Sequence, residues 1–190
     1  MIFPDLLDTI VSAAVGAVIA LGTYSFKKRM DVTLHKKQSA YTKLQEAIHT
    51  SIKEASKIVM YKPFDDLPNP RDIEAFSMLD ERIREVSSSQ QAFIDSCVLI
   101  PLYGEIFLKE GEATFSRYIS DVGVCFQRIE NDLRRVMRLH DEVRYVDDKN
   151  SVCETIVRVK EKSMSLISEA QTKAGDTICD AQTFFKEMIS

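Results

Sequence analysis

Few side chains in this sequence have the type and spacing that chemistry requires. Glu46 and His49 have the E-x-x-H spacing of dinuclear metal sites in helical bundles, but such a site needs a second E-x-x-H motif, and the chain has none. His140 stands beside Asp141 and Glu142, whose side chains point about 100° apart on a helix. We therefore expect no metal site, and we expect His140 to be a partly buried residue on an apolar helix face.

Nucleophile and cofactor motifs are also missing. The sequence contains no G-x-S-x-G elbow, P-loop, G-x-G-x-x-G or H-E-x-x-H pattern. The cysteines follow one another at intervals of 26 or 28 residues, without the close pairs typical of zinc sites, and each falls on or beside an apolar helical stripe: Cys97, Cys125, Cys153 and Cys179. We interpret them as reduced, small core residues. We predict a protein that is not an enzyme and has no cofactor.

The charge is unevenly distributed along the 190 residues. The net charge is −4, but residues 1–37 contain five Lys or Arg against three Asp, so this part carries +2 and the rest of the chain carries −6. Arg134, Arg135 and Arg138 are flanked by acidic residues, which favours a salt-bridged surface over a phosphate site. An acidic body lacks the basic face that replaces counterions around phosphates, so we expect no direct nucleic-acid binding.

One segment has the length of a membrane span. Between Asp8 and Lys27 lie 18 uncharged residues, which cover about 27 Å as a helix, close to the hydrocarbon thickness of a bilayer. A signal peptide would begin with basic residues, whereas the first eight residues include only acidic charges. A buried core helix is the other alternative. We predict a single-pass span in the inner or plasma membrane, with the N-terminus outside and Lys27 onward in the cytoplasm, because the basic residues all follow the span.

The predicted span is rich in small side chains. Ser12, Gly16 and Ala20 are four residues apart, and Ala13 and Ala17 lie beside them. Small residues at this spacing let two helices approach closely in lipid, although Ala and Gly are also common in membrane helices generally. We predict that this face associates with other copies of the chain, giving a homo-oligomer.

A basic collar follows the span directly. Five basic residues lie at the expected membrane surface, where each gains about 1 kcal/mol from anionic lipid: Lys27, Lys28, Arg29, Lys36 and Lys37. Fixing the orientation of the span is by itself a sufficient reason for these charges. The lipid bilayer is therefore one predicted partner, and the two roles of the collar do not exclude each other.

The remaining sequence predicts an all-α protein. Apolar residues recur at three- and four-residue steps along the chain, and no segment alternates as a strand does. The Pro-rich stretch 62–70 predicts a surface loop, Pro101 a kink, Gly111 a short turn, and Ser151 with Glu154 a capping box at the start of the last helix. We predict one transmembrane anchor (residues 1–29) that continues into a cytoplasmic antiparallel bundle of about four long helices (residues 30–190).

These features give a functional hypothesis with two rivals. The favoured one is a non-enzymatic, single-pass membrane protein whose span anchors and oligomerises a cytoplasmic helical domain that binds a protein partner. The alternative is a membrane-acting effector of the toxin or defence type, which forms a pore or lesion when its cytoplasmic domain is triggered. A third reading, weaker than both, is an enzyme whose site is assembled across an oligomer.

Overall fold

The computed structural model describes the backbone of residues 3–69, 73–108, 111–143, 145–146 and 148–189. Within these ranges, the side chains of residues 3–26, 28–29, 32, 73, 105–108 and 188–189 are not described. The residues that the structure describes form four helices: α1 (Phe3–Val59), α2 (Ile73–Leu108), α3 (Glu112–Glu142) and α4 (Lys149–Ile189). The described residues include no strand. The prediction of an all-α protein with four long helices is confirmed.

The chain divides into two compact units, residues 1–43 and 44–190. The first unit is helical throughout its described part, from Phe3 onward. The second unit contains the last part of α1 and the other three helices. The domain boundary that the sequence places at 29/30, where the predicted membrane segment ends, stays a prediction.

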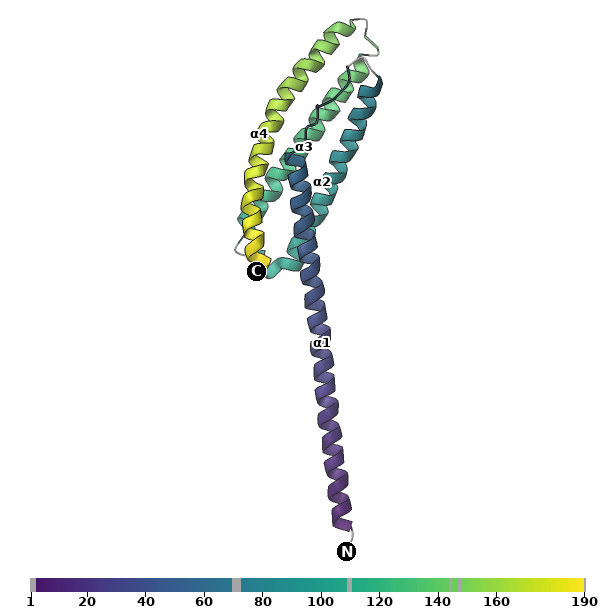
Figure 1. Cartoon of the computed structure of the whole chain (residues 1–190), viewed down its shortest axis with the longest axis vertical. Coiled ribbons are helices and arrows are strands. Elements are labelled where there is room, and N and C mark those ends of the chain that lie inside the picture. The colour runs from purple at the N-terminus through teal and green to yellow at the C-terminus, as the bar shows by residue number, and fades with distance from the viewer. Residues whose placement is uncertain (1–2, 70–72, 109–110, 144, 147, 190) are drawn as a thin grey trace. The chain divides into compact units, whose positions relative to one another are not determined.

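Within residues 44–190 the helices form an antiparallel bundle, in which the chain direction reverses between α1 and α2, α2 and α3, and α3 and α4 (Figure 1). Phe93 of α2 contacts Tyr118 of α3, and Tyr118 contacts Phe185 of α4. Lys57 of α1 pairs with Glu85 of α2 at 3.0 Å. The predicted helical bundle is therefore confirmed for this unit.

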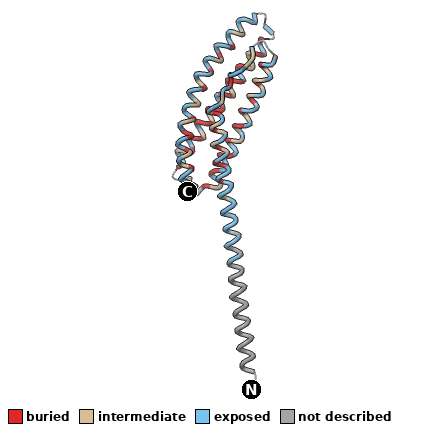
Figure 2. The backbone as a smooth tube through the Cα atoms, viewed as in Figure 1, coloured by how far each residue is buried: buried red, intermediate tan, exposed pale blue. Residues whose placement is uncertain are grey.

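The bundle forms because each helix has one apolar stripe to bury. On α3 the buried residues recur at three- and four-residue steps, and the buried positions of all four helices face the inside of the bundle (Figure 2). The largest side chains that are almost completely buried are Tyr118, Phe93, Phe126, Phe185, Leu44, Leu79, Ile100, Ile129, Leu133 and Ile156.

An aromatic cluster lies at the centre of this core. The ring centroid of Phe93 is 5.5 Å from that of Tyr118, in an edge-to-face arrangement, and 5.7 Å from that of Phe126. Phe185 meets Tyr118 edge-on at 5.8 Å. Edge-to-face pairs add to the free energy gained from area burial. Burial raises the pKa of Tyr118 far above its ordinary value, with the Ser51 hydroxyl acting in the opposite direction, so its side chain stays neutral.

One polar cluster links α3 to α4. The Asp121 carboxylate is only 7% exposed, yet it accepts a hydrogen bond from Thr177 Oγ1 at 2.9 Å and pairs with Lys173 Nζ at 2.9 Å. A buried carboxylate needs such partners, since unpaired it would carry a large desolvation cost. The cluster therefore fixes the sliding register of α4 against α3.

The Pro-rich segment after α1 is held against the bundle by two side chains. Gln171 Nε2 of α4 donates to the carbonyls of Ile58 and Tyr61 at 3.1 and 2.7 Å, which satisfies acceptors at the end of α1. Arg82 of α2 donates to the carbonyls of Pro63 and Asp65, both at 2.6 Å. The end of α1 is thus bound by side chains from α2 and α4.

This segment is more buried than the sequence predicts. Pro63 and Phe64 are buried, and Phe64 belongs to the hydrophobic core, so the prediction of a surface loop is wrong for these two residues. Figure 1 shows why the core reaches them: α1 ends part of the way along the bundle, and the segment continues beside the other helices toward the start of α2.

Burial and the nearby Arg82 lower the pKa of Lys160 on α4.

The helix ends confirm some local predictions and correct others. Pro101 lies inside α2, which continues to Leu108 as predicted, but the kink lies at Gly104, three residues after the proline at which it was predicted. The capping-box prediction at Ser151 is wrong, because α4 begins at Lys149 and Asp148 Oδ1 accepts a hydrogen bond from the Ser151 amide at 3.2 Å. Gly111 precedes the first residue of α3 with an ordinary φ of −116°.

Candidate interaction surface

One face of α2 carries several exposed apolar side chains. Ile94, Val98 and Leu102 are four residues apart, so they lie on the same side of the helix, and they are 44%, 62% and 67% exposed. Leu99 beside them is 39% exposed. We call these four residues the α2 apolar face. The opposite side of the same helix carries the buried residue Phe93, so α2 is apolar on both sides.

The α2 apolar face is exposed because the neighbouring helices contact other sides of α2. Toward α1, Glu85 pairs with Lys57, whose Nζ also donates to Ser89 at 3.2 Å. Toward α3, Phe93, on the side of α2 opposite this face, contacts Tyr118. Exposed apolar side chains grouped on one side of a helix are typical of protein interaction sites, and the exposed Gln91 and Asp95 share this side. This arrangement can bind an apolar helix face or groove of another protein.

The apolar composition of the sequence is a signal for the α2 apolar face, which the three- and four-residue periodicity alone does not reveal. Residues 97–108 read CVLIPLYGEIFL, with a single charged residue in twelve, which is more apolar than one buried stripe requires. The inward apolar stripe of α2 includes Phe93 and Cys97. It does not include Val98 and Leu102, which face outward and have no role in the core. An excess of apolar residues over the inward stripe predicts a second contact surface.

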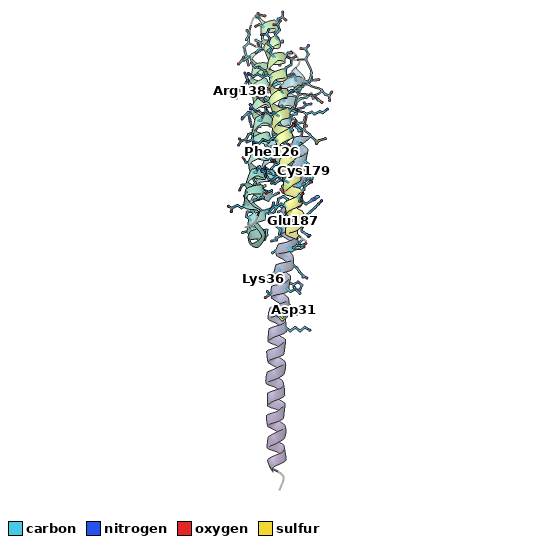
Figure 3. The ribbon with its side chains drawn as sticks, turned by 90° about the vertical axis from the view of Figure 1, so that its left-hand side faces the viewer. Asp31, Lys36, Phe126, Arg138, Cys179 and Glu187 are labelled. Carbon is cyan, nitrogen blue, oxygen red and sulfur yellow. The ribbon has the colours of Figure 1, made fainter. Side chains whose placement is uncertain are left out.

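A hollow of about 430 Å³ lies on α3 and carries mixed charges. It is lined by Asn131, Asp132, Arg135, Arg138, Leu139 and Glu142. The neighbouring Arg134 pairs with Glu130 at 2.6 Å, which confirms the predicted salt-bridged surface for that arginine. Figure 3 shows Arg138 at the surface of the bundle and Phe126 inside it.

The histidines and their acidic neighbours occupy separate environments. Glu46 and His49 are both exposed on α1, whereas His140 is 3% exposed, more buried than the sequence predicts. Asp141 and Glu142, which follow it, are exposed. Across the part of the chain that the structure describes, no group of three or more His, Cys, Asp or Glu side chains is placed to hold a metal ion.

The cysteines differ in accessibility. Cys97 and Cys125 are buried, and burial raises the pKa of each thiol to about 12, so both stay protonated at neutral pH and are poor nucleophiles. Cys153 is partly buried, and Cys179 is exposed on α4 (Figure 3). The prediction of core cysteines is therefore confirmed for the first two and wrong for Cys179.

For most residues of the predicted membrane segment and its basic collar, the structure does not describe the side chains. Ser12, Ala13, Gly16, Ala17 and Ala20, and the collar residues Lys28 and Arg29, lie outside the described side chains. Lys27, Lys36 and Lys37 are described and exposed. Among the described residues, no helix combines the length and the apolarity that crossing a bilayer requires. The structure thus adds no support for the span at residues 9–26, and the span stays a prediction.

Comparison with known protein families, with curated proteins and with solved structures gives no match to this chain.

Proposed function

We propose that this chain is a non-enzymatic, single-pass membrane protein whose cytoplasmic helical bundle binds a protein partner. The observation that carries the proposal is the run of 18 uncharged residues between Asp8 and Lys27, followed directly by Lys28 and Arg29.

The proposed orientation places the N-terminus outside and the bundle in the cytoplasm, in the inner or plasma membrane. Lys27, Lys36 and Lys37 are exposed and so available to anionic lipid. The small residues Ser12, Ala13, Gly16, Ala17 and Ala20 allow spans of several copies to approach closely, which makes the chain a homo-oligomer.

A charge at the centre of the span tests the anchoring. We expect the full chain to stay in the membrane fraction after an alkaline carbonate wash, and Ala17→Leu to behave in the same way. Ala17→Arg should release most of the protein, because an arginine at the centre of a span costs about 2.5–3.5 kcal/mol. Release of the unmodified chain by carbonate, or equal retention of both variants, would contradict the proposal.

The exposed thiol of Cys179 provides a reporter of orientation in the same cells. A membrane-impermeant maleimide should label Asp5→Cys in cells whose outer face is accessible, and should label Cys179 only after lysis. Labelling of Cys179 in intact cells would show the opposite orientation.

For the partner, the proposal assigns the α2 apolar face as the binding surface. A photo-crosslinking residue at Val98 should give one defined adduct in native membranes, and Leu102→Asp should abolish it because a carboxylate would be desolvated in the interface. Val124→Asp is the matched control, since Val124 of α3 is also an exposed apolar residue. The proposal fails if no adduct forms, if Leu102→Asp leaves it unchanged, or if its mass equals two copies of the chain.

A further inference from the structure

The part of α1 between the predicted span and the bundle, residues 27–43, carries large apolar side chains on its surface. Met30 is 57% exposed and Leu34 is 56% exposed. Tyr41 is 45% exposed. The described polar residues of this segment, such as Lys36 and Ser39, are exposed as well. Apolar side chains of this size at helical spacing are typical of a contact surface between helices.

The exposed apolar residues follow a heptad register. Met30, Leu34, Lys37 and Tyr41 are separated by four, three and four residues, which corresponds to alternating d and a positions of a coiled coil. In the sequence the same steps continue to Leu44 and Ile48, both of which are core residues of the bundle. The stripe that begins the core of the bundle therefore extends upstream into residues that are exposed in a single chain.

One charge, that of Asp31, lies at an e position beside the stripe. Thr33, Gln38 and Ala40, which flank it at the e and g positions, are uncharged. Lys36 and Lys43 fall on the opposite side of the helix. At its flanks a parallel pair brings no two basic residues together, but the register places Lys27 and Lys37 in the stripe itself, where each faces its copy at a cost in stability.

The register also identifies the occupant of the stripe. Counting back from Leu34 by the same steps reaches Met30, Lys27, Thr23, Ala20 and Gly16, so the small residues of the predicted span share the register of the stripe. The partner must therefore present small residues within the lipid and large apolar residues beyond it, in the same continuous register. A second copy of α1 has this pattern. Copies anchored in one membrane are parallel and aligned, which is the geometry that a symmetric coiled coil requires.

We propose that residues 27–43 of α1 form a parallel coiled coil with the same segment of a second copy of the chain. The inference rests on the proposed membrane anchoring, which aligns the copies. The segment is about 25 Å long as a helix and holds little more than two heptads, so it is short for an independent coiled coil and depends on that alignment. Lys37 is a polar position within the stripe, of the kind that specifies register at a cost in stability.

Cysteine crosslinking in membranes tests the coiled coil in the full chain. In a background with Cys153→Ser and Cys179→Ser, which removes the accessible thiols, Met30→Cys and Leu34→Cys should each form a disulfide-linked dimer on mild oxidation. Lys36→Cys and Ser39→Cys, from other sides of the same helix, should give at least about tenfold less dimer, because their thiols stay too far apart for a disulfide. Both Met30→Cys and Leu34→Cys must crosslink, since an antiparallel pair would bring residue 34 of the two copies together but would keep the two copies of residue 30 apart.

Equal crosslinking at all four positions, or crosslinking at Leu34→Cys alone, would overturn the proposal. Carbonate extraction of the same samples separates the two proposals. If the chain stays in the membrane but does not crosslink selectively at residues 30 and 34, the coiled coil is refuted and the anchoring is not. If the chain is released but still crosslinks at both of these positions, only the anchoring is refuted.

A second variant tests the role of Lys37. Lys37→Leu replaces the one described polar side chain in the stripe between Met30 and Tyr41, so we expect it to lower the dissociation constant of the detergent-solubilised dimer at least about tenfold. Ser39→Leu adds the same side chain away from the stripe and should leave that constant unchanged. Weaker association of Lys37→Leu would contradict the coiled coil.

Discussion

Phe93→Ala is expected to destabilise the bundle by about 3–5 kcal/mol, the range measured when a buried aromatic side chain is truncated to alanine. Phe93 is 1% exposed and contacts Tyr118 and Phe126, both on α3. Removing its ring leaves a cavity at the junction of α2 and α3 and deletes two aromatic contacts. Since domains are stable by only about 5–15 kcal/mol, this one change removes a large part of the free energy of unfolding.

The adjacent residue supplies the matched control for Phe93→Ala. Ile94 follows Phe93 on the same helix but is 44% exposed, so we expect Ile94→Ala to cost less than about 1 kcal/mol. The chain has no tryptophan, so unfolding in urea is best followed by far-UV circular dichroism of the full chain in mild detergent. Equal midpoints for the two variants would contradict the assigned core.

Gly111→Ala is expected to destabilise the fold by about 1–3 kcal/mol through overpacking. A Cβ atom at Gly111 would overlap the ring of Phe184 on α4, so the ring or the turn must move. The ring is also packed against Phe185, with centroids 5.6 Å apart, which hinders its displacement. The backbone at Gly111 has a φ of −116°, which alanine adopts readily, so the expected loss comes from the close approach and not from conformational strain.

Gly123→Ala is the control for this substitution and should have the opposite sign. Gly123 lies inside α3, and a Cβ atom there would have no atom of the described structure within 4 Å. Replacing an interior helical glycine by alanine stabilises a helix by about 1 kcal/mol. The new methyl group meets the Phe184 ring at Gly111 and no atom at Gly123, so thermal unfolding midpoints that rise for both variants would refute the assigned packing of the turn.

Much of the fold was predictable because the signals are local. The three- and four-residue steps of apolar side chains predict α3 and its buried face correctly, since those steps follow from the geometry of a single helix. Pro101 predicts a kinked helix, because the proline ring removes one hydrogen bond wherever the helix is placed, but the non-helical backbone lies three residues later, at Gly104. The predicted cap at Ser151 is wrong because Asp148, three residues earlier, satisfies the same helix end.

The candidate interaction surface was not predictable from the sequence in the same way. The apolar run at 97–108 has enough apolar residues for two faces, but the sequence does not say which face the neighbouring helices will cover. Val98 and Leu102 are exposed because α1 and α3 contact other sides of α2, as the Lys57–Glu85 pair and the Phe93–Tyr118 contact show. A choice between two apolar faces depends on packing, which involves residues far away in the chain.

The sequence by itself determined the helices, their inward stripes and the uncharged run at 9–26, because these depend on residue type and spacing within one segment. Only the tertiary structure decided that Phe64 joins the core, that Cys179 stays outside it, and that Gly111 lies against Phe184. Each of these outcomes depends on which distant segment lies beside the residue. Burial is a property of such neighbours and not of the residue alone.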